Sequence, residues 1–337
     1  MATPSPSLSP SPVNLWVVLS ESKRIINAHS RHFLALSVLF LLPLCFSVTV
    51  YPSVFRLITD QSSASHNSVS LLRGLHDSDV VVVDTKTTVL LLIAYIVVVT
   101  VFNLLAIGSI AYSVFQGFYG RPVRFISAVK SSFASFLPLL ATLISSNFIV
   151  LGLFLILGFP AFLLNKEFDY ASPYFQAVTM VVTVISILAV VKLYVDWILA
   201  WVVVVVESAW GLAPLKRSKS LVKGMKSVSL SIIFFFATTE SVLVWISTVA
   251  ASAQLDDDGG KLWPNAFFVL QIVITSAVLT LLMLYNLAAT TVMYMYCKAV
   301  HGELAWEIAE EFAREYVSLP FDEGKVPHLV SVAYNNI

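Results

Sequence analysis

The chain has 337 residues, of which 58% are hydrophobic and only 12% are charged. Soluble domains carry about 25% charged residues, so this chain has too few polar groups to cover a soluble globule of its size. Its 20 basic and 20 acidic residues balance, so the chain has no overall positive field that would attract nucleic acid. The two cysteines, Cys45 and Cys297, lie near opposite ends of the chain and exclude a disulfide framework.

The N-terminal part is polar and divides into two segments. Residues 1–12 are rich in serine and proline, cannot bury a core and are expected to be disordered. In residues 13–32, apolar side chains such as Trp16 and Ile25 alternate with charged ones such as Lys23. This pattern is typical of an amphipathic helix that lies in a membrane interface, with its tryptophan at the level of the lipid headgroups.

Residues 33–297 contain six apolar runs, each close to or above the ~20 residues that a helix needs to cross a bilayer. The runs are Phe33–Tyr51, Thr88–Phe115, Phe133–Leu164, Tyr174–Val206, Val228–Ala251 and Asn265–Tyr296. Pro43 interrupts the first run, where a kink is tolerated. We therefore predict an all-α fold, a polytopic bundle of about six transmembrane helices with amphipathic helices on the cytosolic side.

Lysine and arginine residues concentrate on one side of these runs. They are frequent before the first run, in the connections after the second and fourth runs, and after the sixth run, and they are sparse in the other connections. Cytosolic loops carry an excess of lysine and arginine. Both termini are therefore predicted to lie in the cytosol, with the protein in an endomembrane or the plasma membrane.

Polar side chains recur inside the predicted spans at one depth, roughly 20 Å from their expected cytosolic ends at about 1.5 Å per residue. The residues of this polar layer are Asn103, Asn147, Lys192, Glu240 and Asn286, with Asp196 one turn from Lys192 on the same helix face. Two interpretations stay open. The layer fixes helix packing, with Lys192 paired to Asp196 or Glu240, or it is the mid-membrane site of a transporter.

The connection after the fourth run is the most basic part of the chain. Its basic residues are Lys216, Arg217, Lys219, Lys223 and Lys226. At 100° per residue the lysines fall on one side of a helix, and Leu215 and Val222 fall on the other. Pro214 stands where a first helical turn tolerates it. The pattern predicts a basic amphipathic helix that binds anionic lipid headgroups, with an ordinary cytosolic loop as the alternative.

Residues 298–337 are predicted to form a cytosolic tail, acidic between Glu303 and Glu315, with Leu304 and Ile308 at helical spacing. An anionic membrane repels an acidic helix, so we expect this tail to dock on the basic connection or on a soluble partner. Cys297 ends the sixth run on the cytosolic side, a position that predicts S-palmitoylation.

The sequence carries no motif of a known enzyme class: GxGxxG, the P-loop, HExxH, CxxC and GxSxG are absent. Neither enzymatic activity nor a cofactor is predicted. His29, His32 and His301 are interpreted as neighbours of lipid headgroups and not as metal ligands. The leading hypothesis is a non-enzymatic integral membrane protein that acts in membrane organisation or trafficking through its cytosolic face. The alternative is a small-solute transporter that uses the polar layer.

Three stretches carry a recognisable pattern. They are Trp197-x-Leu199-Ala200-x-Val202-Val203-x-Val205-x-Glu207-x3-Gly211-x6-Ser218-x2-Leu221-x2-Gly224, then Val292-x-Tyr294-x2-Cys297-Lys298-x2-His301 followed by Tyr316-Val317, and Tyr119-Gly120-Arg121-Pro122-Val123. Together they resemble a plant family of multi-pass membrane proteins of uncharacterised function. A fainter similarity links the chain to the membrane domain of some glycerophosphodiester phosphodiesterases. The resemblance implies a six-span helical membrane protein in a plant and implies no reaction, and Lys192 and Asp196 lie outside the pattern.

Overall fold

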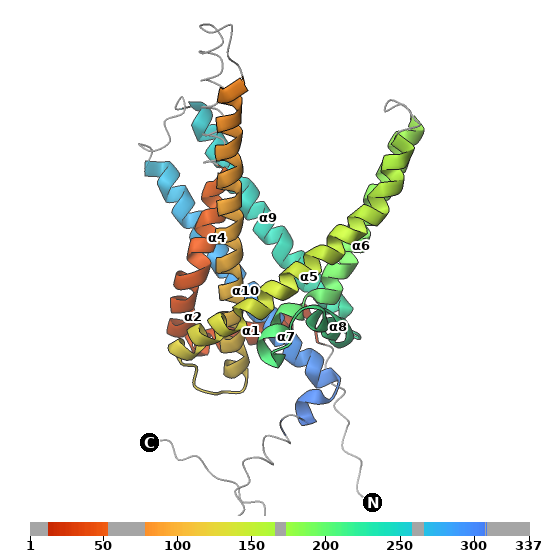
Figure 1. The fold of residues 1–337 in the computed structure, drawn as a ribbon. Helices are drawn as coiled ribbons and strands as arrows, with labels where there is room; N and C mark the ends of the chain where they lie inside the picture. Colours follow the sequence, from red (N-terminus) through yellow and green to blue (C-terminus); the bar gives the residue numbers. More distant parts are fainter. Residues whose placement is uncertain (1–12, 53–77, 166–172, 258–265, 307, 309–337) are drawn as a thin grey trace, which may run out of the picture. The chain divides into compact units, whose positions relative to one another are not determined.

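The computed structural model describes residues 13–52, 78–165, 173–257, 266–306 and 308 (Figure 1). Within these ranges the chain is helical and contains no strand, so the predicted all-α class is confirmed. The chain divides into two units, residues 1–297 and 298–337. The predicted disordered tail, residues 1–12, and most of the acidic tail lie outside the described residues.

The helices of Figure 1 follow one another along the chain in three groups. The first group holds α1 (Leu15–Ala28), α2 (Ser30–Leu36) and the π-helical turn η1 (Ser37–Leu41). The second holds the long helices α4 (Ser78–Phe118), α5 (Phe125–Asn165) and α6 (Pro173–Trp197). The third begins with two short helices, α7 (Ala200–Glu207) and α8 (Leu212–Leu221), and ends with α9 (Lys226–Asp257) and α10 (Ala266–Val300).

Six helical stretches are long and apolar enough to cross a membrane, as the sequence predicts. They are Ser30–Pro52, Val89–Phe118, Phe125–Gly158, Gln176–Glu207, Lys226–Ala250 and Val269–Val300. Each overlaps one of the six predicted runs. Large apolar side chains are exposed along most of these stretches, which is typical of helices that are hydrophobic on all sides.

The first apolar stretch is regular except at η1, which lies immediately before Pro43. Proline has no N–H, and its ring crowds the carbonyl group four residues earlier. A π-helical turn changes the hydrogen-bond spacing at that point and relieves this conflict. The sequence predicts a tolerated kink at Pro43, and the structure shows a local change of helix type before it, with the helix continuing to residue 52.

Helices α4 and α5 contact each other and form part of the core. At their close approach, a Cβ atom on Gly108 would lie 2.9 Å from Cα of Ser132, so only glycine fits there. The Ser132 hydroxyl donates a hydrogen bond to the carbonyl oxygen of Leu105 at 2.6 Å. Beside this approach, α4, α5 and α7 share a buried apolar cluster made of Leu104, Ile107, Leu139 and Val204.

Helix α1 lies where the interfacial segment is predicted, and it contacts α4. Its buried residues include Val18 and Ile25, whereas Trp16 is 72% exposed. A Cβ atom on Gly117 of α4 would lie 3.0 Å from the side chain of Ile25, so the two helices approach closely.

The fourth predicted span, Tyr174–Val206, is not one continuous helix. Helix α6 ends at Trp197 and α7 begins at Ala200. The apolar pattern continues across residues 198 and 199, so composition alone could not predict the break. At the break, the side chain of Ser218 on α8 forms hydrogen bonds with two backbone groups, which are described below.

Candidate functional site

The break between α6 and α7 is part of a compact region, residues 195–229, that we call the α6–α9 junction. Helix α8 lies inside this region and contacts α5, α6 and α7. One side of α8 and of the turn that follows it is buried, with Leu215 3%, Leu221 1% and Val222 0% exposed. The opposite side carries exposed lysines, which we call the basic face: Lys216, Lys219 and Lys223.

Ser218 of α8 bridges the helix break. Its side chain is fully buried, and its hydroxyl donates a hydrogen bond to the backbone carbonyl of Asp196 at 2.8 Å. The same oxygen accepts a hydrogen bond from the backbone N–H of Leu199 at 3.2 Å. A buried backbone group without a partner is costly, so one serine satisfies both ends of the interruption and fixes α8 against it.

Asp196 lies at the end of α6, and its side chain is 3% exposed. Its carboxylate forms an ion pair with Lys226, the first residue of α9, at 3.6 Å between Oδ1 and Nζ. One turn further along α9, the hydroxyl of Ser229 donates a hydrogen bond to the carbonyl of Val195 at 3.4 Å. These two contacts hold the start of α9 against the end of α6.

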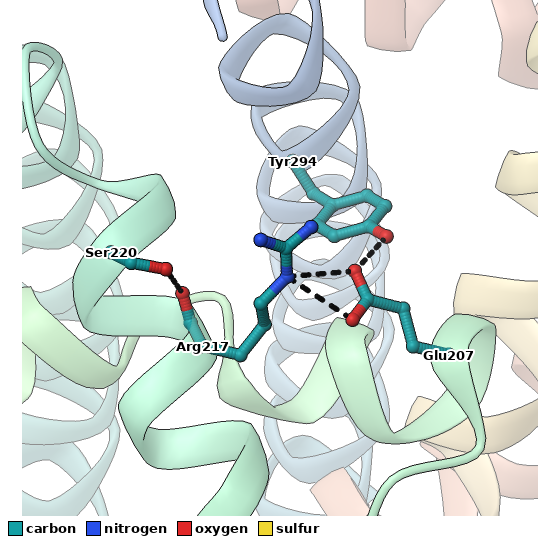
Figure 2. Close-up of polar contacts among 4 residues, drawn as sticks. All are labelled: Glu207, Arg217, Ser220 and Tyr294. Carbon is teal, nitrogen blue, oxygen red and sulfur yellow. Dashed lines mark hydrogen bonds and ion pairs between the residues drawn. The ribbon is translucent and has the colours of Figure 1, made fainter. Parts of the chain in front are cut away.

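Glu207 ends α7 and joins three helices, as Figure 2 shows. The fully buried Tyr294 of α10 donates a hydrogen bond from its hydroxyl to Glu207 Oε1 at 2.8 Å. Arg217 of α8 donates from Nε to Glu207 Oε2 at 3.2 Å. Since Arg217 binds this carboxylate, it belongs to the scaffold of the junction more than to the basic face.

The turn between α7 and α8 needs unusual backbone conformations. Ser208 has a φ of 53° and Gly211 has a φ of 70°, both in the left-handed region. The N–H of Gly211 donates a hydrogen bond to the hydroxyl of Thr142 on α5 at 3.2 Å, which holds the turn in place. Between these residues, Trp210 is 70% exposed, next to the start of α8.

The structure brings together only part of the predicted polar layer. Asn286 of α10 donates a hydrogen bond from Nδ2 to Oε1 of Glu240 on α9 at 3.2 Å. Asn103 is half-buried, and Asn147 and Lys192 are exposed.

Among the described residues, Lys192 forms no ion pair with Asp196 or Glu240, so the expected pairing is wrong. Asp196 pairs with Lys226 instead, because the start of α9 lies against the end of α6. Lys192 lies one helical turn earlier on α6, where its side chain is exposed.

Cys297 is completely buried, with its sulfur 3.7 Å from the sulfur of Met225. An acyl-transfer reaction needs an accessible thiol, so this burial contradicts the predicted palmitoylation at Cys297.

The expected docking of the acidic tail on the basic connection involves residues 309–317, which lie outside the described residues. The apolar side chains of the basic connection on which such a tail could pack, Leu215, Val222 and Met225, are themselves buried. Among the described residues, no group of three or more His, Cys, Asp or Glu side chains could hold a metal ion.

The stretches that carry the family resemblance contain the residues that build the junction. Leu199, Glu207, Gly211 and Ser218 belong to the first stretch, and Tyr294 belongs to the second. We did not predict a structural role for any of them, because serine, tyrosine and glutamate at these places carry no periodic signal. Their contact partners also lie far away in sequence.

No solved structure and no curated protein sequence matches the chain. One family model, described as a domain of unknown function, DUF8558, matches residues 12–319. The plant origin and the similarity to glycerophosphodiester phosphodiesterase membrane domains stay predictions. The match covers the six long apolar helices and the α6–α9 junction together, and the chain therefore belongs to the DUF8558 family.

Proposed function

We propose that this chain is an integral membrane protein whose basic face binds anionic lipid headgroups in the cytosolic leaflet and so organises the surrounding membrane. The six long apolar helices support insertion in a bilayer, because their exposed apolar surface is far larger than soluble proteins carry. The distribution of basic residues supports an orientation with both termini and residues 207–227 in the cytosol.

The observation that carries the lipid proposal is that α8 and the turn after it have one exposed basic side and one buried apolar side. Lys216, Lys219 and Lys223 are exposed, whereas Leu215 and Leu221 are buried. Helix α8, which carries Lys216 and Lys219, packs against α5, α6 and α7, and this packing supports a defined arrangement of the basic face.

Two exposed apolar side chains add to this surface, namely Trp210, two residues before α8, at 70% and Leu212, the first residue of α8, at 51%. Tryptophan is enriched at membrane–water interfaces, and each lysine near an anionic surface adds roughly 1 kcal/mol to binding.

The test compares lysines of the basic face with other exposed basic residues. The full chain is placed in phosphatidylcholine nanodiscs and titrated with dioctanoyl phosphatidylserine. The triple variant Lys216→Gln, Lys219→Gln, Lys223→Gln should bind this lipid roughly a hundredfold more weakly, at about fivefold per lysine. Arg217 and Lys226 stay unchanged, because they bind Glu207 and Asp196.

The matched control removes the same charge elsewhere, with Lys23→Gln, Arg31→Gln and Lys130→Gln, which are also exposed. It should keep most of the affinity. Equal losses in the two variants would mean that general charge and not the basic face attracts the lipid. Tight binding of a soluble acidic polypeptide in place of the lipid would favour a protein partner.

Orientation has its own test, since both cysteines of the native chain are buried. Single cysteines at Ser65 and Ser227 are labelled in sealed vesicles with an impermeant thiol reagent. Ser227→Cys should react only from the cytosolic side and Ser65→Cys only from the other side. Labelling of both from one side overturns the proposed orientation.

A small-solute transporter is the second proposal, and the contact between Glu240 and Asn286 favours it. An ionisable side chain within a long apolar helix is costly in a membrane and often marks a transport site. Proteoliposome uptake across a panel of solutes tests this idea. Uptake that is lost in Glu240→Gln and kept in the lysine variant would favour transport over lipid binding.

A further inference from the structure

The sequence Arg217-Ser218-Lys219-Ser220 contains two serines in very different surroundings. Ser218 is fully buried, and both of its hydrogen bonds go to the backbone at the helix break. Ser220 is exposed, and its hydroxyl donates a hydrogen bond to the carbonyl of Arg217 at 2.7 Å, as Figure 2 shows. Of the two hydroxyls, only that of Ser220 is open to an enzyme from the surface.

Positive charge surrounds Ser220 in both directions along the chain. Arg217 precedes it by three residues, and the exposed Lys216, Lys219 and Lys223 precede and follow it. Charge patterns of this kind decide which substrates a protein kinase selects, and a basic segment fits a kinase with an acidic substrate groove. Ser220 is also the penultimate residue of α8, and the last turn of a helix opens more readily than its middle.

We propose that Ser220 is a phosphorylation site and that its phosphate releases the basic face from anionic lipid. The proposal rests on the proposed function of this face. In the reaction, the Ser220 oxygen forms a bond to the γ-phosphorus of a nucleoside triphosphate, and the bond from that phosphorus to the β–γ bridging oxygen breaks. The hydroxyl proton passes to a base of the kinase, and the nucleoside diphosphate leaves.

The phosphate adds a charge of about −1.5 to −2 in the middle of the basic face. It can accept hydrogen bonds from lysines of this face, since Lys216 is four residues away on the same helix. These lysines are then paired inside the protein, and the net charge that faces the membrane falls by about two. At about fivefold per charge, affinity for anionic lipid should fall roughly thirtyfold.

The first experiment tests access to the serine. The full chain in phosphatidylcholine nanodiscs is incubated with a basophilic serine kinase and magnesium ATP, and phosphorylated positions are mapped by mass spectrometry. Phosphate should appear on Ser220 and not on Ser218, and Ser220→Ala should abolish it. Phosphate on Ser218, or on the exposed Ser227 with Ser220 unmodified, contradicts the proposal.

The second experiment tests the consequence without depending on one kinase. Phosphoserine is encoded genetically at position 220, and dioctanoyl phosphatidylserine is titrated as before. The phosphorylated chain should bind the lipid roughly thirtyfold more weakly, and Ser220→Ala should bind it as the unmodified chain does. The same modification encoded at Ser227 is the matched control and should have a smaller effect.

The outcomes separate the two proposals. If the triple lysine variant weakens lipid binding and phosphoserine at 220 does not, the lipid surface stands and the phosphorylation switch is wrong. If the triple lysine variant binds the lipid as the unmodified chain does, the proposed function itself is wrong, and the switch falls with it.

Discussion

The α6–α9 junction and the Glu240–Asn286 pair are two polar regions in one apolar chain, and they are built differently. In the junction, Ser218 binds two backbone groups at a helix break, and a side-chain pair, Glu207 with Tyr294, joins α7 to α10. In the second region, one side chain of α9 binds one side chain of α10, and no break accompanies this contact. A polar residue in an apolar chain can therefore belong to the scaffold as well as to a site, and a side chain that binds backbone groups at a helix break, as Ser218 does, belongs to the scaffold.

The largest effect is expected at Ser218, because its loss leaves two backbone groups of the junction without their partner. Ser218→Ala should lower the free energy of unfolding by about 2–6 kcal/mol, at ~1–3 kcal/mol for each of the two unsatisfied groups. Denaturation in mixed micelles of dodecyl maltoside and sodium dodecyl sulfate measures this change. Ser220→Ala is the control and should cost less than ~0.5 kcal/mol. Equal losses would mean that Ser218 is not the bridge.

The second prediction concerns the close approach of α4 and α5, which share an apolar cluster with α7 of the junction. Gly108→Ala places a methyl group 2.9 Å from Cα of Ser132 and should destabilise the fold by about 1–3 kcal/mol. Gly152→Ala on α5 meets no atom within 4 Å and should stabilise its helix by up to about 1 kcal/mol. The two substitutions are chemically identical, so opposite signs in the same denaturation assay confirm the close approach.

Double-mutant cycles compare the two polar regions directly. For the junction, Glu207→Gln and Tyr294→Phe should show a coupling energy of about 1–2 kcal/mol, since Tyr294 is fully buried. For the second region, Glu240→Gln and Asn286→Leu should show about 0.5–1 kcal/mol, typical of single hydrogen bonds between helices in membranes. The reverse order would make the Glu240–Asn286 pair the stronger anchor and would weaken the comparison drawn above.

The six long helices follow from the sequence because apolar length is a local property. The exposed and buried sides of α8 follow too, since helical periodicity separates Lys216 and Lys219 from Leu215. The break at residues 198–199 could not be predicted, because the serine that binds its backbone groups, Ser218, lies about twenty residues further along the chain. Counting residues from the expected cytosolic ends places Asn147 and Glu240 at one depth, but in the described structure no hydrogen bond joins them, and Glu240 binds Asn286.

The position of Lys192 shows that depth in the membrane alone does not predict which side chains form an ion pair. It lies one turn from Asp196 on α6, but the partner of Asp196 is Lys226, which is fixed where α9 begins. If Lys192 held a buried carboxylate, its removal would cost about 3–5 kcal/mol. Since it is exposed, Lys192→Ala should change the free energy of unfolding by less than ~0.5 kcal/mol.

Lys226→Ala is the matched variant for Lys192→Ala, whose effect is expected to be the smallest. It removes the cation that faces a carboxylate with 3% exposure, but Lys226 itself is 54% exposed, so solvent screens part of the interaction. A loss of about 1–2 kcal/mol is expected, well above that of Lys192→Ala. A larger loss for Lys192→Ala in the same micelle assay would support the pairing of Lys192 with Asp196 that the sequence predicts, and would contradict the pairing with Lys226.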